Sequence, residues 1–182
     1  IFNALRELAP NFDQTILAGY PPFIKDVLDE AQGQGIDLEK LNIRLLFAAE
    51  PFSEKFRDYV FEKIKGGNIH TDTLNIYGTA DIGTMAYETP TAILIRRLAV
   101  QNPVLFGDLF PDIQKTPTLT QYNPLFITFE SVGGKILLTG DNTFPLIRYD
   151  LGDHGGVFTF SEIMARLEQH GIGGFGVQPH FQ

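Results

Sequence analysis

The sequence has no cysteine and few serines. Its 182 residues include no cysteine and only three serines. Without cysteine there are no disulfides, thiolate metal ligands or thiol nucleophiles, and a reducing, cytoplasmic location is expected. No serine stands in G-x-S-x-G, so the nucleophile elbow of an acyl-serine hydrolase is missing. The histidines lack the spacing of metal ligands, so no zinc site is expected; they are His70, His154, His170 and His180.

Basic clusters and long apolar runs are also missing. Acidic residues outnumber basic ones by 22 to 14, giving a net charge of -8, and no Lys/Arg cluster interleaves with aromatics. A nucleic-acid partner is therefore not expected. No apolar run approaches the roughly 20 residues of a membrane span, and no signal pattern opens the chain. The hydrophobic content of 43% is ample for a globular core. The opening "IFNALRELAP" has no initiator Met, as expected for a segment of a longer protein.

The first half alternates short apolar runs with segments of helical spacing. The apolar runs cover residues 15–18, 43–48 and 74–77. The intervening segments predict one helix from Pro22 to Gly33 or Gly35, and a second with Ser53 as N-cap and Gly66-Gly67 as its end. This βαβαβ pattern predicts a parallel sheet with right-handed crossovers and helices on its faces. Ligands of such sheets gather at the carboxyl ends of the strands.

After residue 90 the pattern changes to an antiparallel one. A helix is predicted with Thr89 as cap and Pro90 in its first turn, followed by a hairpin through Gly133-Gly134, where a primed turn needs positive φ angles. A last helix is predicted with Ser161 as cap and Gly171 as its end. We therefore expect an α/β nucleotide-binding subdomain over 1–103, an antiparallel sheet or barrel-like subdomain over 104–160, and a helix with a flexible tail over 161–182.

Three turns carry carboxylates. Glu50 in "FAAEPFS" follows the second predicted strand, and Asp81 in "YGTAD" follows the third. Because carboxyl ends of parallel strands share one edge of a sheet, we expect Glu50 and Asp81 at the same edge. The third turn, "PLIRYDLGDHG", lies in the antiparallel region and contains Arg148, Asp150 and Asp153. Taken singly, each turn also has a purely structural interpretation, since carboxylates favour helix starts and Asp beside Gly is ordinary turn chemistry.

Taken together and in this order, these turns resemble the adenylate-forming acyl-activating superfamily. "AAEP" is followed by "YGTAD", which begins 26 residues after Pro51, and then by "GGKILLTG" and "PLIRYDLGD". Within the superfamily the sequence looks most like the phenylacetate–coenzyme A ligases and related AMP-dependent synthetases. The resemblance covers about residues 15 to 153, which implies part of the large N-terminal domain of such an enzyme.

The resemblance implies an activity and a set of site residues. Members of the family join a carboxylate to ATP, release pyrophosphate and pass the acyl-adenylate to a thiol such as that of coenzyme A. By resemblance, the backbone of Ala49, Glu50 and Pro51 is expected to form a wall beside the adenine, and Tyr77 and Gly78 are expected to pack on the adenine and border the acyl pocket. Asp81 is expected to bind Mg²⁺ near the phosphates, since this hard cation prefers oxygen ligands. Asp153 is expected to accept hydrogen bonds from the ribose hydroxyls.

The chain departs from the family pattern in several places. Ala80 stands where the family has a Thr or Ser that donates to the α-phosphate, and Thr79 is the candidate substitute. Asp81 replaces the usual Glu. No Gly/Ser/Thr-rich triphosphate loop precedes residue 15, and the lid domain with its catalytic Lys is absent, so no turnover is expected from this segment alone.

Two alternatives stay open at this point. One is a non-catalytic homologue that binds a nucleotide or an acyl group, and the other is an unrelated α/β nucleotide-binding domain. The identity of the acid is open, as is the acceptor, which could be coenzyme A, a carrier-protein thiol or an amine. A homodimer is expected from the subfamily. The G-x-G-x-x-G match at 171–176 follows a helix and leads to no second one, so we expect a tail there rather than a dinucleotide site.

Overall fold

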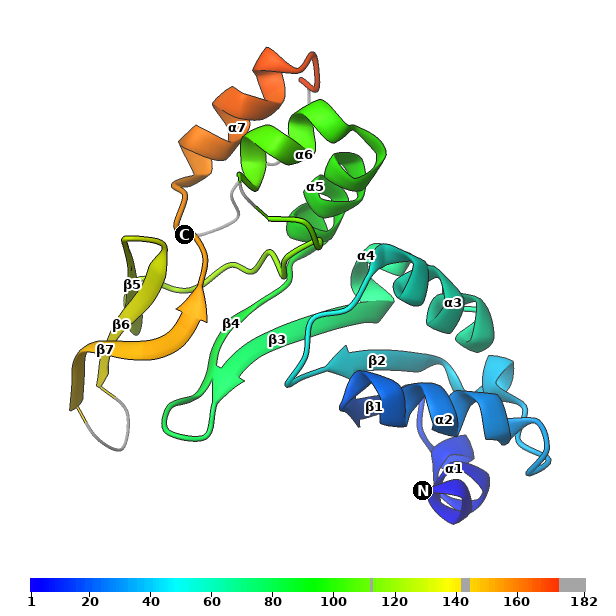
Figure 1. Ribbon diagram of the computed structural model, residues 1–182. Helices are drawn as coiled ribbons and strands as arrows, with labels where there is room; N and C mark the ends of the chain where they lie inside the picture. The colour runs from blue at the N-terminus through cyan, green and yellow to red at the C-terminus, as the bar shows by residue number, and fades with distance from the viewer. Residues whose placement is uncertain (112, 142–144, 174–182) are drawn as a thin grey trace. The chain divides into compact units, whose positions relative to one another are not determined.

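The computed structural model describes residues 1–111, 113–141 and 145–173, and it contains two compact units (Figure 1). The first unit comprises Ile1–Arg97 and Lys115–Gln121. The second comprises Leu98–Gln114 and the chain from Tyr122 onward. The predicted tail after residue 173, including His180 and the second half of the G-x-G-x-x-G match, lies outside the described residues.

The first unit is built on a four-stranded sheet in the order β1-β2-β3-β4. Its elements are α1 (Phe2–Glu7), η1 (Ala9–Asn11), β1 (Thr15–Gly19), α2 (Pro21–Ala31), η2 (Leu38–Leu41), β2 (Ile43–Phe47), α3 (Glu54–Ile64), α4 (Ile69–Asp72), β3 (Thr73–Thr79) and β4 (Gly83–Tyr87). Strands β1, β2 and β3 are parallel, while β4 runs antiparallel to β3. The predicted βαβαβ pattern is confirmed.

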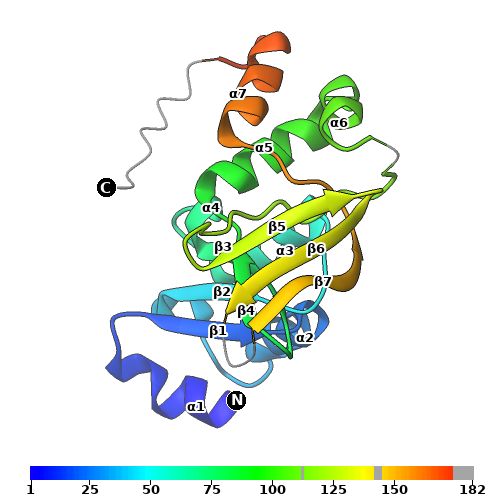
Figure 2. The same cartoon turned by 90° about the vertical axis from the view of Figure 1, so that its left-hand side faces the viewer.

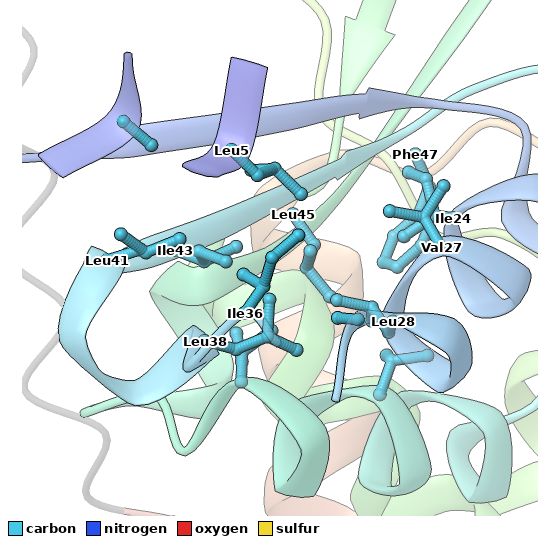
Figure 3. Close-up of a cluster of buried hydrophobic side chains, with 14 of the residues drawn as sticks. Leu5, Ile24, Val27, Leu28, Ile36, Leu38, Leu41, Ile43, Leu45 and Phe47 are labelled. Atoms are coloured by element: carbon cyan, nitrogen blue, oxygen red, sulfur yellow. The ribbon is translucent and has the colours of Figure 1, made fainter. Parts of the chain in front are cut away.

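The core of this unit lies where β2 meets the helices that follow β1 and β2. Every second residue of β2 is buried, namely Ile43, Leu45 and Phe47, as expected when one face of a strand is covered. Figure 3 shows Phe47 beside Ile24 and Val27 of α2. Burying one such side chain contributes about 1.5–3 kcal/mol, so this cluster holds the carboxyl end of β2 firmly in place.

The helix boundaries in the first unit follow the sequence signals closely. The Ser53 hydroxyl accepts a hydrogen bond from the Phe56 amide at 3.2 Å, and the Thr89 hydroxyl accepts one from the Ala92 amide at 3.2 Å. Both predicted N-caps are therefore confirmed, the second at the start of α5 (Pro90–Gln101). Helix α3 ends at Ile64, and Lys65 adopts the left-handed conformation there with φ 48°, just before the predicted Gly66-Gly67.

The second unit combines short helices with a three-stranded antiparallel sheet. After the last residues of α5 come α6 (Pro103–Leu109), β5 (Ile127–Val132), β6 (Lys135–Asp141), β7 (Pro145–His154) and α7 (Phe160–Gln169). Strand β6 lies between β5 and β7, as Figure 2 shows. Gly133 and Gly134 join β5 to β6 with φ angles of 59° and 78°. The predicted hairpin and the sheet form of the antiparallel subdomain are confirmed.

Two local features of the second unit differ from expectation. Helix α6 was not predicted; Asn102 caps it through hydrogen bonds from the Val104 and Leu105 amides at 3.1 and 3.2 Å. The predicted Ser161 cap of the last helix is wrong. Thr159 is the N-cap, because its hydroxyl and the Glu162 carboxylate form a reciprocal capping box. Across the three described ranges, no helix has the length and apolar character needed to span a bilayer.

Candidate nucleotide-binding site

The loop after β2 is held in an unusual backbone conformation. The Ala48 amide donates to the Gly19 carbonyl at the end of β1, at 3.1 Å. The next residue, Ala49, has φ 77°, a left-handed conformation that disfavours any side chain with a Cβ. Glu50 and Pro51 follow at exposed positions. Backbone strain of this kind is common at ligand-binding sites. The strained residue, Ala49, belongs to the segment that is predicted to lie beside the adenine.

A tyrosine that sequence reasoning missed lies beside Glu50. The Tyr20 hydroxyl donates to Glu50 Oε1 at 3.3 Å, and the nearby carboxylate raises the pKa of Tyr20. Tyr20 follows β1 directly, and Glu50 comes after β2, so the contact joins the carboxyl ends of two neighbouring parallel strands. The position of Tyr20 immediately after an apolar run is the signal that could have identified it.

The "YGTAD" segment lies in the hairpin formed by β3 and β4, which extends past the end of β2. Phe47, the last residue of β2, pairs with Asn75, and β3 then continues to Thr79 before turning into β4 (Figure 1). Four further residues at about 3.3 Å each carry the strand about 13 Å beyond β2. Asp81 lies in the turn at an exposed position. Glu50 and Asp81 thus follow the same edge of the sheet, as expected, but the strand register separates them along the strand direction.

The glycine of the "YGTAD" segment has a structural reason within this hairpin. A Cβ on Gly78 would lie 2.4 Å from the Gly83 carbonyl oxygen on β4, too close for any side chain. Tyr77 pairs with Ala86, and the register shifts between Tyr77 and Gly78. The Thr79 hydroxyl accepts from the Ile82 amide at 3.4 Å, which is a long hydrogen bond across the turn. A hydroxyl that accepts one hydrogen bond can still donate another, which is compatible with the donor role that the resemblance implies for Thr79 beside Ala80.

A group of buried charges, Glu54, Arg57, Glu88 and Arg96, lies next to both segments; we call it the buried ion cluster. Arg57 Nη2 contacts both oxygens of the Glu88 carboxylate at 2.8 Å. Arg96 Nη1 lies 3.1 Å from Glu88 and 3.0 Å from Glu54, while Arg57 Nε donates to Glu54 at 3.0 Å. Burial raises the pKa of the Glu88 carboxyl, and the two guanidiniums act in the opposite direction. The cluster balances two carboxylates against two guanidiniums.

Sequence reasoning missed this cluster, although a signal was present. Arg57 shares a helical stripe with Val60 and Ile64, and Arg96 shares one with Ile93 and Ala99; all six are buried. A charged residue on the apolar stripe of a helix must be paired when buried, because an isolated buried charge is very costly. The stripe indicates burial, but it does not indicate which distant carboxylate provides the partner.

The third carboxylate turn belongs to β7 of the second unit. Asp150 accepts from the Gly152 amide at 2.9 Å and from Lys135 Nζ at 3.0 Å, and these contacts lower the pKa of its carboxyl. Arg148 donates to Glu130 at 3.1 Å. Arg148 and Asp150 therefore take part in local contacts of the sheet. Asp153 lies at an exposed position near the end of β7.

The Asp81 carboxylate suits a magnesium ion that is bound mainly through substrate phosphates and water. Within the part of the chain that the structure describes, no group of three or more His, Asp or Glu side chains is placed to hold a metal ion. Mg²⁺ is commonly bound through one or two carboxylates together with substrate phosphates and water. The exposed Asp81 carboxylate in a small-residue turn fits that pattern of binding.

Comparison with known proteins bears on the fold. No protein-family model and no curated protein matches the chain. Among solved structures, the chain is similar to 2-hydroxyisobutyryl-CoA ligase, solved in an open conformation with 2-HIB-AMP and CoA, with 12% identity and a TM-score of 0.58 over 84% of this chain. Another match is an AMP-forming acyl-CoA synthetase/AMP-acid ligase II-like protein of Dyadobacter fermentans, with 12% identity and a TM-score of 0.39 over 69% of this chain.

The likeness to 2-hydroxyisobutyryl-CoA ligase shows the fold of the chain. Its α/β sheet and separate antiparallel sheet together have the fold of part of an acyl-CoA ligase, which confirms the resemblance predicted from the sequence at the level of the fold. The chain covers 31% of the 2-hydroxyisobutyryl-CoA ligase chain and 28% of the Dyadobacter fermentans chain. It therefore corresponds to about a third of the length of the structures that it resembles.

Proposed function

We propose that this chain is part of the adenylation domain of an AMP-forming acid–thiol ligase. The full enzyme would activate an aryl or small carboxylic acid with ATP and transfer the acyl group to coenzyme A. One observation carries the proposal. The segments "AAEP" and "YGTAD" follow the carboxyl ends of adjacent parallel strands, β2 and β3, in a fold shared with an acyl-CoA ligase.

The proposed reaction has two steps. A carboxylate oxygen of the acid attacks the α-phosphorus of ATP, and the bond to the β-phosphate oxygen breaks to release pyrophosphate. The sulfur of coenzyme A then attacks the acyl carbon, loses its proton, and displaces AMP. Because two anions must approach in the first step, the site has to surround the α-phosphate with hydrogen-bond donors and positive charge.

Different residues of this chain are proposed to bind different parts of the acyl-adenylate. The backbone of Ala49, Glu50 and Pro51 lies beside the adenine, and the strained φ of Ala49 fixes how that backbone is presented. Tyr77 and Gly78 border the adenine and the acyl group. The roles proposed for the remaining residues are α-phosphate donation by Thr79 next to Ala80, metal binding by Asp81 and ribose binding by Asp153. Mg²⁺ held at Asp81 would supply charge neutralisation for the phosphates.

A second candidate is a non-catalytic homologue that retains nucleotide or acyl binding. The observation in its favour is the turn of the β3–β4 hairpin, where Ala80 has no hydroxyl and Asp81 is one methylene shorter than Glu. Both changes remove reach at the point where the phosphates would be contacted. We place this candidate second because the fold and the loop after β2 are retained.

ATP–pyrophosphate exchange on the full-length protein tests the proposal. The assay uses Mg²⁺ and a panel of aryl and alkyl carboxylic acids, and exchange that depends on one acid is the expected result. Asp81→Asn should reduce exchange by at least tenfold, whereas Asp13→Asn, which changes an exposed carboxylate elsewhere in the first unit, should leave it unchanged. Absence of exchange with every acid, in a protein that still binds ATP, would favour the non-catalytic candidate, and Ala80→Thr would then be the first variant to make.

The acceptor and the assembly form a separate part of the proposal. Formation of a thioester with coenzyme A, measured by mass, distinguishes it from a carrier-protein thiol or an amine acceptor. A homodimer in the cytoplasm remains our prediction, and light scattering of the purified protein tests its oligomeric part.

A further inference from the structure

We infer that the buried ion cluster is a positioning device that sets the loop after β2 and the β3–β4 hairpin at fixed places relative to each other. This inference rests on the proposed function, because these two segments are the parts of the first unit assigned to the nucleotide. The four residues of the cluster are buried, so they would act through the backbone that they hold.

The first arm of the device reaches the loop through Phe52, the residue after Pro51. Arg96 Nη2 donates to the Phe52 carbonyl oxygen. The guanidinium carbons of Arg57 and Arg96 also lie 4.9 and 5.4 Å from the centre of the Phe52 ring, within the range of a cation–π contact. Phe52 packs edge-on against Phe47 at 4.7 Å between ring centres. The loop is thus held at both its carbonyl and its side chain.

The second arm reaches the hairpin through β3. Glu88, which directly follows β4, accepts a hydrogen bond from the Asn75 amide at 3.0 Å, two residues before Tyr77. Arg57 Nη1 donates to the Thr73 carbonyl and lies 3.1 Å from the Thr73 hydroxyl. Because Arg57 and Arg96 share the Glu88 carboxylate, the two arms form one connected set of hydrogen bonds.

Stability alone is a poor reason for this arrangement. Arg57 and Arg96 are fully buried and Glu88 is 1% exposed. Removing such charges from water costs about as much as their attraction returns, and apolar replacements of similar volume are often neutral. Paired hydrogen bonds from a guanidinium to a carboxylate fix the relative position of the two segments that carry these groups. The reason is that a guanidinium binds a carboxylate in a fixed plane, whereas apolar contacts permit sliding. That property is useful where two segments must hold one nucleotide.

Arg96 and its neighbour Arg97 provide a matched pair for the test. Both lie on α5, and Arg97 also forms ion pairs, at 2.8 Å with Asp58 and 3.2 Å with Glu54. In the described part of the chain, Arg97 forms no hydrogen bond or ion pair with Phe52 or with β3, and its side chain is 23% exposed. Arg96→Met therefore removes the contact with the Phe52 carbonyl, and Arg97→Met removes an ion pair with the same carboxylate, that of Glu54, while leaving the contact with Phe52 in place. Arg96→Lys keeps the positive charge but loses the paired N–H donors of the guanidinium. It replaces Arg96→Met in the experiment if Arg96→Met does not fold.

The experiment measures AMP and pyrophosphate binding by calorimetry on the full-length protein, together with amide hydrogen exchange. Arg96→Met should weaken AMP binding about tenfold, change pyrophosphate binding less than twofold, and speed exchange at residues 48–53 and at Asn75. Arg97→Met should change none of these by more than twofold. A purely structural role would weaken both ligands together with the melting temperature, and that result, or unchanged exchange in Arg96→Met, overturns the inference. Absence of AMP binding by the unaltered protein instead overturns the proposed function, and the positioning role with it.

Discussion

Arg96 and Phe52, which are 44 residues apart in the sequence, are joined by two contacts at once. The guanidinium donates to the Phe52 carbonyl, and its carbon lies 5.4 Å from the centre of the Phe52 ring. The loop that carries Ala49 and Glu50 therefore ends on a buried and directional anchor. Its other end is tied to β1 by the hydrogen bond from Ala48 to Gly19. A loop restrained at both ends is suited to present its backbone to a ligand without reorganising.

Replacing Ala49 by Gly should stabilise the protein. Release of the left-handed strain at φ 77° gains about 1–2 kcal/mol, and the greater freedom of Gly in the unfolded chain costs about 0.5–1 kcal/mol. We expect a net gain of about 0.5–1 kcal/mol in the free energy of unfolding, measured with urea. The control Ala48→Gly changes a residue with no positive φ and should lose about 0.5–1 kcal/mol. A loss of stability in Ala49→Gly would contradict the strained loop.

Substituting Gly78 should damage the hairpin far more than substituting Gly83. A Cβ on Gly78 meets the Gly83 carbonyl oxygen at 2.4 Å, so β3 and β4 must separate, at a cost of about 2–3 kcal/mol. Gly83 has φ 82° and open space around it, so Gly83→Ala should cost only backbone strain, about 1 kcal/mol. Urea unfolding of the two alanine variants compares them directly. Equal losses would show that the hairpin does not close as described.

Changing Asp153 should affect only nucleotides that carry ribose hydroxyls. If its carboxylate pairs with the ribose diol, Asp153→Asn should weaken ATP binding about tenfold or more and leave 2′,3′-dideoxy-ATP binding within twofold. Asp150→Asn is the matched control on the same strand, because Asp150 is engaged by Gly152 and Lys135. Calorimetric titration with both nucleotides is the measurement. Parallel weakening of ATP and its dideoxy analogue would remove the ribose role from Asp153.

The contribution of Asp29 to stability should depend on pH. A hydrogen bond from Lys25 at 2.7 Å, with further contacts from Tyr59 and Lys63, depresses the pKa of the Asp29 carboxyl well below its ordinary value. A depressed folded-state pKa contributes stability above the unfolded value near 3.9, and this contribution is lost as pH falls through the folded-state value. Asp29→Asn should therefore cost about 1 kcal/mol at pH 7 and progressively less below about pH 4.

Urea unfolding at pH 7 and at pH 3 measures this difference. Asp26→Asn, at an exposed position of the same helix, is the control and should change stability by less than about 0.5 kcal/mol at either pH. A cost of Asp29→Asn that stays constant from pH 7 to pH 3 would show that the carboxylate charge is not what Lys25 and Tyr59 stabilise.

Much of the fold could be predicted because its signals are local. Apolar runs and helical spacing rest on interactions between residues a few positions apart, and so do the caps at Ser53 and Thr89. The Gly133-Gly134 turn follows from the same kind of local restriction. The wrong prediction of the helix cap at Ser161 was also a local one. Thr159 outcompeted Ser161 as a cap because it pairs reciprocally with Glu162, and both residues were plausible from their side chains alone.

The sequence by itself determined the order of the elements and placed Glu50 and Asp81 after neighbouring parallel strands. Only the tertiary structure decided that β3 continues about 13 Å beyond β2, because strand register depends on pairing between distant segments. It also decided which carboxylate neutralises Arg57 and Arg96. Burial of these guanidiniums could be read from the apolar stripes of their helices, but their shared partner Glu88 comes from the end of β4. Electrostatic pairing in a low-dielectric interior is set by three-dimensional proximity, which spacing along the chain does not encode.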